Sequence, residues 1–221
     1  MQAIMEPIFD IGYLVSVIVL GVLMLRRGQG AERLFGAMAV TLGAGDSFHL
    51  IPRVAALRTT GLAAHAAALG VGRLVTSLTM TAFYVLLYYV WRRRYRVQGR
   101  RGLTAAVWLL AAARAALCLL PQNAWTSPNP PLFWGVARNI PFTLLGVLLM
   151  VLWFQSAAGG RDKGFGHLWL ALAVSFGCYI PVVLFADAVP AVGILMIPKT
   201  CAYLWAVLIG YNDMKRRLSV Q

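Results

Sequence analysis

The stretch LTAAVWLLAAARAALCLL, residues 103–120, decides the fold class of this chain. It carries one charged residue, Arg114, and its apolar residues do not alternate with polar ones as in a half-buried β-strand. A helix needs about 20 apolar residues to cross a bilayer core about 30 Å thick. The stretch therefore predicts a membrane-spanning helix with a charge inside it.

The whole chain has the composition of a membrane protein. Hydrophobic residues make up 60% of its 221 residues, charged residues make up only 12%, and the mean hydropathy is +0.73. A soluble core of this size cannot enclose so much apolar surface. We predict an all-α polytopic membrane protein with a single domain, residues 1–221, and seven transmembrane helices. The predicted spans are 7–25, 34–52, 70–91, 103–121, 132–155, 165–186 and 190–211.

Most basic residues lie on one side of these spans. The loops after spans one, three and five and the tail contain Arg26, Arg27, Arg33, Arg92, Arg93, Arg94, Arg96, Arg100, Arg101, Arg161, Lys163, Lys215, Arg216 and Arg217. The opposite loops contain only Arg53 and Arg58. The positive-inside rule then predicts the N-terminus outside and the C-terminus in the cytoplasm.

The net charge of +13 is mostly a consequence of this topology. Basic residues next to a membrane span indicate anionic lipid head groups as partners rather than nucleic acid. Glu6 and Asp10, rather than basic residues, precede the first span, so no cleavable signal peptide is expected.

Charged residues inside the predicted spans form a second pattern. Such groups normally face a cavity or a partner, because their exposure to lipid is costly. With a rise of 1.5 Å per residue and the predicted topology, five of them, from five helices, fall in the outer half of the membrane. These five are Asp46, Arg73, Arg114, Arg138 and Lys199.

Other polar and aromatic residues are predicted at the same depth. Asp46, His49 and Arg53 are spaced i, i+3 and i+7, which places them on one stripe of a helix. The complete set of candidate ligand-binding residues is Asp46, His49, Arg53, Arg73, Ser77, Tyr84, Arg114, Arg138, Asn139, Tyr179, Lys199 and Tyr203.

Proline occurs in four Ile-Pro pairs, at 51–52, 140–141, 180–181 and 197–198. Inside a helix, proline leaves the carbonyl four residues earlier without its hydrogen bond. At membrane depth such a carbonyl needs a partner, so the pairs are either simple kinks or part of a site. The outer connector PQNAWTSPNPPLF, 121–133, is rich in proline and is either a stiff lid over the site or a compact connector.

One intramembrane acid cannot balance four cations. Asp46 can clamp one cation in a structural ion pair, which leaves the others as a positive field. Our preferred hypothesis is recognition of an anionic small molecule or lipid head group, with a phosphate or carboxylate, for transport or sensing. The second hypothesis is an intramembrane lipid hydrolase in which Asp46 or His49 is the general base and an arginine stabilises the oxyanion.

Neither a metal site nor a cofactor is predicted. The chain has three histidines, His49, His65 and His167, and their positions do not assemble a set of metal ligands.

Several motifs together resemble a group of uncharacterised bacterial seven-helix integral membrane proteins. The resemblance covers most of the chain and implies the seven-helix fold and a place in the bacterial cytoplasmic membrane. The motifs that carry it are GDSFHLIPR (45–53), PQNAW (121–125), SPNPP (127–131), ARNIPF (137–142), YIPVVLFAD (179–187) and IPKTCAYLW (197–205).

Three characterised groups share parts of this pattern. Asp46, Ser47 and His49 resemble part of the Ser, Asp and zinc-binding His set of the alkaline ceramidase and adiponectin-receptor hydrolases, although the last span has no histidine. Gly45 and Asp46 resemble the Gly-Asp pair of lysoplasmalogenase-type proteins. Lys199 is similar in position to the retinal lysine of microbial rhodopsins, whose carboxylates in spans three and seven are missing here. The resemblance to rhodopsins implies retinal binding through Lys199 as a further alternative.

Overall fold

The computed structural model describes residues 2–59, 61, 63–157, 162–186 and 188–219. Every regular element in these residues is a helix. Seven of the helices are long and apolar enough to cross a membrane, which confirms the predicted number of spans. The long helices are α1 (Gln2–Arg27), α2 (Ala31–Arg58), α3 (Ala66–Arg94), α4 (Arg101–Leu119), α5 (Leu132–Ala157), α6 (Leu168–Phe185) and α7 (Met196–Leu218). Three short 3-10 helices are η1 (Ala63–His65), η2 (Pro121–Asn123) and η4 (Pro190–Leu195).

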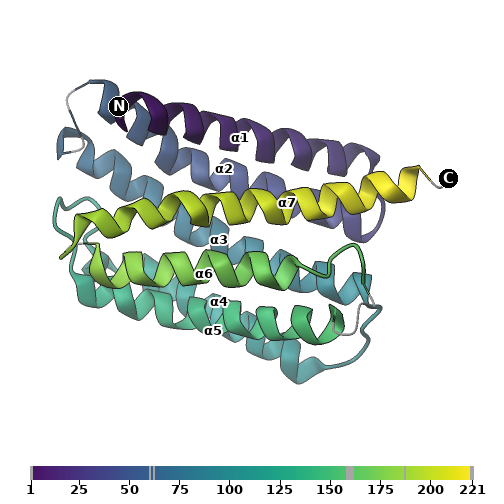
Figure 1. Cartoon of the computed structure of the whole chain (residues 1–221). Coiled ribbons are helices and arrows are strands. Elements are labelled where there is room, and N and C mark those ends of the chain that lie inside the picture. Colours follow the sequence, from purple (N-terminus) through teal and green to yellow (C-terminus); the bar gives the residue numbers. More distant parts are fainter. Residues whose placement is uncertain (1, 60, 62, 158–161, 187, 220–221) are drawn as a thin grey trace.

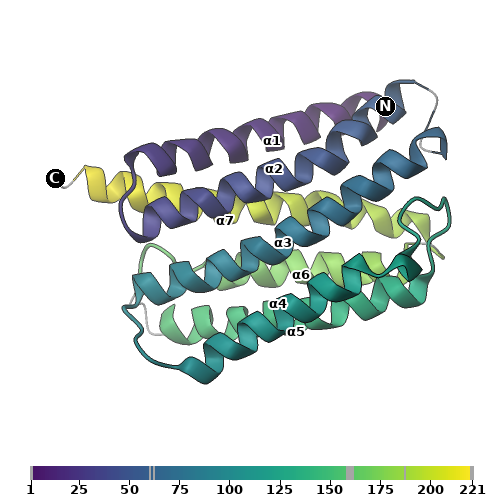
Figure 2. The same cartoon turned by 180° about the vertical axis from the view of Figure 1, so that it is seen from behind.

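The seven helices form one bundle and follow one another around it in chain order (Figure 1). The ring closes because α7 packs against α1, and α7 also contacts α2 (Figure 2). The two termini lie at opposite ends of the bundle. We call the end at which α1 begins the N-terminal end, and the other the C-terminal end.

Three helices finish at the C-terminal end in basic turns. The last turn of α1 contains Arg26 and Arg27, that of α3 contains residues 92–94, and that of α7 contains residues 215–217. Cations in the last turn are favourable because the carbonyl groups there carry the negative end of the helix dipole. The predicted loop residue Arg161 and the motif residue Asp187 lie outside the described residues.

The first helix corrects one prediction. Glu6 and Asp10 were expected at the start of the first span, whose predicted bounds, 7–25, include Asp10, and α1 begins before both of them. Glu6 forms an ion pair with Arg53 of α2, and Asp10 is buried. Contacts with α2 therefore allow the helix to include these acids.

The four Ile-Pro pairs lie in two different settings. Pro52, Pro141 and Pro181 lie inside α2, α5 and α6, each of which continues past its proline. Pro198 lies in the first turn of α7, where the backbone N–H has no helical partner to lose. The last span is thus η4 followed by α7, rather than one helix broken at Pro198.

Close contact between α2 and α3 brings two polar helix faces together. A Cβ atom on Gly72 would lie 2.2 Å from the carbonyl oxygen of Phe48, so the helices can approach this closely only with glycine there. The Thr76 hydroxyl donates a 3.0 Å hydrogen bond to the Gly45 carbonyl across the same interface. This packing fixes Asp46 of α2 in the bundle.

Candidate functional site

Asp46 is held by a residue that the sequence did not single out. The Tyr13 hydroxyl of α1 donates a 2.8 Å hydrogen bond to Oδ2 of Asp46. Tyr13 is buried in the core. The charge of Lys199 on α7 also acts on Asp46, without a direct ion pair between these two described side chains. Asp46 therefore connects α1, α2 and α7.

Lys199 lies among aromatic rings. Its Nζ atom is 5.0 Å from the ring centre of Tyr179 on α6 and 5.5 Å from that of Tyr203, one turn along α7. These distances allow cation–π attraction. The Tyr203 hydroxyl lies 3.4 Å from the Tyr84 hydroxyl of α3, which carries the arrangement into the centre of the bundle.

Arg114, the charge inside the opening stretch, lies in the same region. Its side chain is only 2% exposed, and its Cζ atom stands 3.4 Å from the ring centre of Phe142 on α5. Nε and Nη1 have no hydrogen-bond partner in the described part of the chain. Tyr179 and Tyr203 are close enough to act on the guanidinium electrostatically. The guanidinium is thus buried among aromatic rings without a described acidic partner.

These residues form one arrangement contributed by five helices. We define the central cluster as Asp46, Tyr84, Arg114, Tyr179, Lys199 and Tyr203. It contains two cations and one acid.

A groove leads from the outer surface of the bundle toward the central cluster. It lies between α5 and α6, has a volume of about 210 Å³, and is lined mainly by apolar side chains such as Ile140 and Val183. Asn139, Thr143 and Tyr179 are its polar lining residues, and the Tyr179 hydroxyl donates a 2.9 Å hydrogen bond to Oδ1 of Asn139. Because Tyr179 also contacts Lys199, one side chain separates the groove from the cluster.

Arg138 lies near the central cluster, because Tyr179 and Arg114 are close enough to act on it electrostatically, but its direct contacts are with the connector after α4. Its Nη1 donates a 2.7 Å hydrogen bond to Oδ1 of Asn123, and its Cζ lies 4.2 Å from the ring centre of Trp125. Asn123 is fully buried and belongs to η2, and the Trp125 indole donates to the Cys118 carbonyl. The connector after α4 is therefore compact, and Arg138 fastens it to α5.

The stripe of Asp46, His49 and Arg53 is divided by the structure. Arg53 turns to Glu6 at the interface of α1 and α2. His49 lies beside α3, where the charges of Arg53 and Arg73 act on it, and the charge of Lys199 also reaches it. The stripe thus marks helix contacts, and only Asp46 belongs to the central cluster.

Ser77 has a local role in α3. Its hydroxyl donates a 2.8 Å hydrogen bond to the carbonyl of Arg73, and its own carbonyl accepts one from Thr81. Such bonds satisfy the hydroxyl within the helix. Ser77 was predicted as a ligand contact, and the structure instead shows its hydroxyl engaged with its own backbone.

A second charged cluster, at the C-terminal end, was not anticipated from the sequence. Arg94 donates to Asp162 at 2.5 and 2.7 Å and to Asp213 at 2.7 and 3.1 Å. The Tyr95 hydroxyl donates to Asp162 at 2.9 Å. These contacts tie α3 to the connector before α6 and to α7. The sequence had singled out only Arg94, as a basic loop residue, and the acids Asp162 and Asp213 among so many cations were the available signal.

The contacts of Asp162 determine its ionisation. Burial disfavours its charged form, but the hydrogen bonds from Arg94 and from the Phe165 backbone N–H outweigh burial and hold the pKa of the Asp162 carboxyl below its ordinary value. Burial, and then the hydrogen bond to Asp162, raise the pKa of the Tyr95 hydroxyl. Asp162 is thus an anion in the native protein at neutral pH.

No group of three His, Cys, Asp or Glu side chains is placed to hold a metal ion among the residues that the structure describes. No protein-family model, curated protein or solved structure matches the chain. The resemblances to seven-helix proteins therefore stay predictions, and the function is argued from geometry.

Proposed function

We propose that the central cluster binds an anionic small molecule or lipid head group, for transport or sensing. The observation that carries the proposal is Arg114, a guanidinium buried among aromatic rings with no acidic partner in the described residues. Lys199 adds a second cation, and Asp46 supplies the one negative charge. A phosphate or carboxylate would complete the charge balance.

The energetics favour such a ligand. An unpaired buried cation costs several kcal/mol. The cation–π contact with Phe142 offsets about 2 kcal/mol of this cost when the pair is desolvated. An anion that pairs with Arg114 would remove the rest of this cost, because arginine can donate two parallel hydrogen bonds to a carboxylate or phosphate.

The groove between α5 and α6 supplies a route for the ligand. Its apolar lining suits the chain of an amphiphile, and its polar floor, Asn139 and Tyr179, directs the head group toward Lys199. On this proposal the anion displaces the Tyr179 ring from its place and becomes the partner of Arg114.

We also propose the orientation predicted from the basic residues and the bacterial location implied by the resemblance. The N-terminal end then faces outward and the C-terminal end faces the cytoplasm of a bacterium, in its cytoplasmic membrane. The central cluster would lie in the outer half of that membrane.

A thermal-shift assay on the purified protein tests ligand binding. The probes are lysophosphatidylglycerol, succinate and inorganic phosphate, with zwitterionic lysophosphatidylcholine as the ligand control. A ligand at 100 times its Kd stabilises by about 2.7 kcal/mol, which corresponds to roughly 5–10 °C for a protein of this size. We expect at least one anion to raise the Tm of the wild type.

The matched variants are Arg114→Met and Arg101→Gln. Both remove one cation from α4, but Arg101 is exposed at the start of that helix. We expect Arg114→Met to abolish the anion-induced shift and Arg101→Gln to preserve it. An equal shift in wild type and Arg114→Met, or no shift with any anion, contradicts the proposal.

Lipid hydrolysis is a second candidate function, and the hydrogen bond between Tyr13 and Asp46 favours it. A carboxylate held in place inside the bundle is a candidate general base. Product release from phospholipid by the wild type and its loss in Asp46→Asn would support hydrolysis. Turnover that persists in Asp46→Asn would exclude Asp46 as the general base, and no turnover by the wild type would leave binding as the function.

A further inference from the structure

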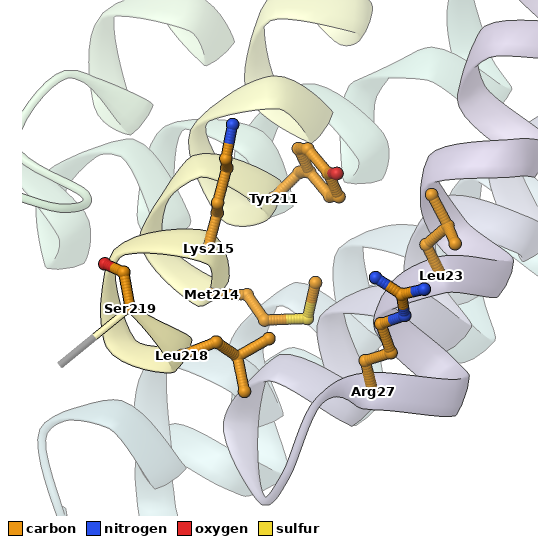
Figure 3. Close-up of a pocket in the computed structure, with 7 residues that line it drawn as sticks. All are labelled: Leu23, Arg27, Tyr211, Met214, Lys215, Leu218 and Ser219. Carbon is orange, nitrogen blue, oxygen red and sulfur yellow. The ribbon is translucent and has the colours of Figure 1, made fainter. Parts of the chain in front are cut away.

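A pocket at the C-terminal end lies between α1 and α7 (Figure 3). Its volume is about 300 Å³. Arg27 from α1 and Lys215 from α7 stand on its two sides, and Met214 and Leu218 lie between them. The pocket thus has cationic walls and an apolar floor.

Hydroxyl groups complete the polar lining. The Tyr211 hydroxyl points across the pocket toward α1 in Figure 3, and Ser219 lies at its edge beside the end of α7. The Ser219 hydroxyl already donates a 2.9 Å hydrogen bond to the Arg216 carbonyl, so the donors that face a ligand are one guanidinium, one ammonium and the Tyr211 hydroxyl, which match the oxygen atoms of a phosphate group.

The acids nearest to this end are already engaged. Asp213 pairs with Arg94 and Arg217, and Glu32 pairs with Arg217. Neither Arg27 nor Lys215 forms an ion pair with an acid in the described ranges. The positive charge of the pocket is therefore left for a partner from outside the bundle.

The position of the pocket indicates where that partner comes from. Arg27 and Lys215 lie in the last turns of two membrane-spanning helices, at the level where lipid head groups meet the helix ends. Leu23, one turn before Arg27, continues the pocket as an apolar surface toward the membrane interior. Basic pockets between transmembrane helices are suited to anionic head groups.

We propose that this pocket binds the phosphate of an anionic phospholipid from the adjoining leaflet. Arg27 and Lys215 bind the phosphate from opposite sides, the Tyr211 hydroxyl donates to it, and the acyl chains run along Leu23. Lipid bound here joins the end of α1 to the end of α7, the contact that closes the ring of helices.

Native mass spectrometry of the detergent-purified full chain tests the site. The protein is mixed with phosphatidylglycerol or phosphatidylcholine, and the retained lipid is counted. We expect a phosphatidylglycerol adduct that phosphatidylcholine does not displace. Arg27→Gln with Lys215→Gln should weaken it by roughly 25-fold, since one basic residue near an anionic lipid contributes roughly 5-fold.

The control is Arg26→Gln with Arg216→Gln, which removes the same charge from the same two turns at residues outside the pocket. This control, and Arg114→Met, should keep the adduct. Inorganic phosphate at millimolar concentration should compete only weakly, because it lacks the chains that pack along Leu23.

Equal weakening by the two double variants would mean that general surface charge attracts the lipid, and it would overturn the proposal. An unchanged adduct in Arg27→Gln with Lys215→Gln would overturn it as well. If free phosphate displaced the phosphatidylglycerol adduct as strongly as added phosphatidylglycerol does, a phospholipid would not be the ligand of this pocket. If Arg114→Met lost the adduct and both double variants kept it, the lipid would bind in the central cluster and not in this pocket.

Discussion

Replacing Arg94 with glutamine tests how the C-terminal end of the bundle is held together. Among the described residues, Arg94 is the only cation that forms an ion pair with Asp162. Arg94 and Arg217 both form ion pairs with Asp213. The side chain of Arg94 is 10% exposed, and those of Asp162 and Asp213 are each 9% exposed. The substitution leaves two buried carboxylates close together without the guanidinium that bridges them.

The expected loss follows from this burial. Removing one partner of a buried ion pair costs about 3–5 kcal/mol. At 2–4 °C for each kcal/mol in a protein of this size, the Tm should fall by roughly 10 °C. Arg93→Gln is the control, because Arg93 is exposed one position earlier and makes a single 3.4 Å hydrogen bond to the Gly30 carbonyl. It should change stability by no more than about 0.5 kcal/mol.

The same assay, scanned over pH, tests the assignment to Asp162. The native pKa of Asp162 lies below its value in the unfolded chain, which is about 3.9. Its contribution to stability is therefore complete above about pH 4 and is lost as the pH falls through the native pKa. The Tm difference between wild type and Arg94→Gln should be constant near neutral pH and should narrow in acid.

Equal Tm values for Arg94→Gln and Arg93→Gln would refute this reasoning. A difference that grows in acid would refute the assignment to Asp162, because protonation of that carboxyl removes the interaction.

Two further substitutions test the packing, both by thermal melts. Gly72→Ala should lower the Tm by several degrees because its Cβ would meet the Phe48 carbonyl oxygen, whereas Gly177→Ala, with no atom within 4 Å, should leave the Tm unchanged or raise it. Asn123→Ala should cost about 1–3 kcal/mol, because it removes the acceptor of Arg138 and three donated hydrogen bonds, and it should speed hydrogen exchange in the connector after α4. A fall in Tm for Gly177→Ala as large as that for Gly72→Ala would contradict the packing assignment. An unchanged rate of hydrogen exchange in the connector of Asn123→Ala would contradict the role of Asn123.

The sequence predicted the seven spans because hydropathy over about 20 residues reports directly on membrane crossing. It placed the end of the last helix less well. The predicted span 190–211 is a 3-10 helix followed by α7, which continues to Leu218. Hydropathy cannot show that continuation, because residues 215–217 are basic and end the apolar run. The helix nevertheless continues past the apolar core, since its backbone hydrogen bonds are still satisfied there.

The candidate site was predicted in part. Charges at one predicted depth indicated that Asp46, Arg114 and Lys199 would meet, and they belong to one cluster. Depth does not specify the direction of a side chain around its helix, so Arg53 and Arg138 were grouped with them although their contacts lie elsewhere. Contacts between residues far apart in sequence, including that of Tyr13 with Asp46, leave no periodic pattern to detect.

A structure of the protein with its most stabilising anion bound tests the central claim most directly. The account predicts the phosphate or carboxylate of that ligand within hydrogen-bond distance of Nε or Nη1 of Arg114, with Lys199 nearby and the Tyr179 ring displaced toward the groove. An anion bound only at the C-terminal end, with Arg114 still stacked on Phe142, would contradict the account.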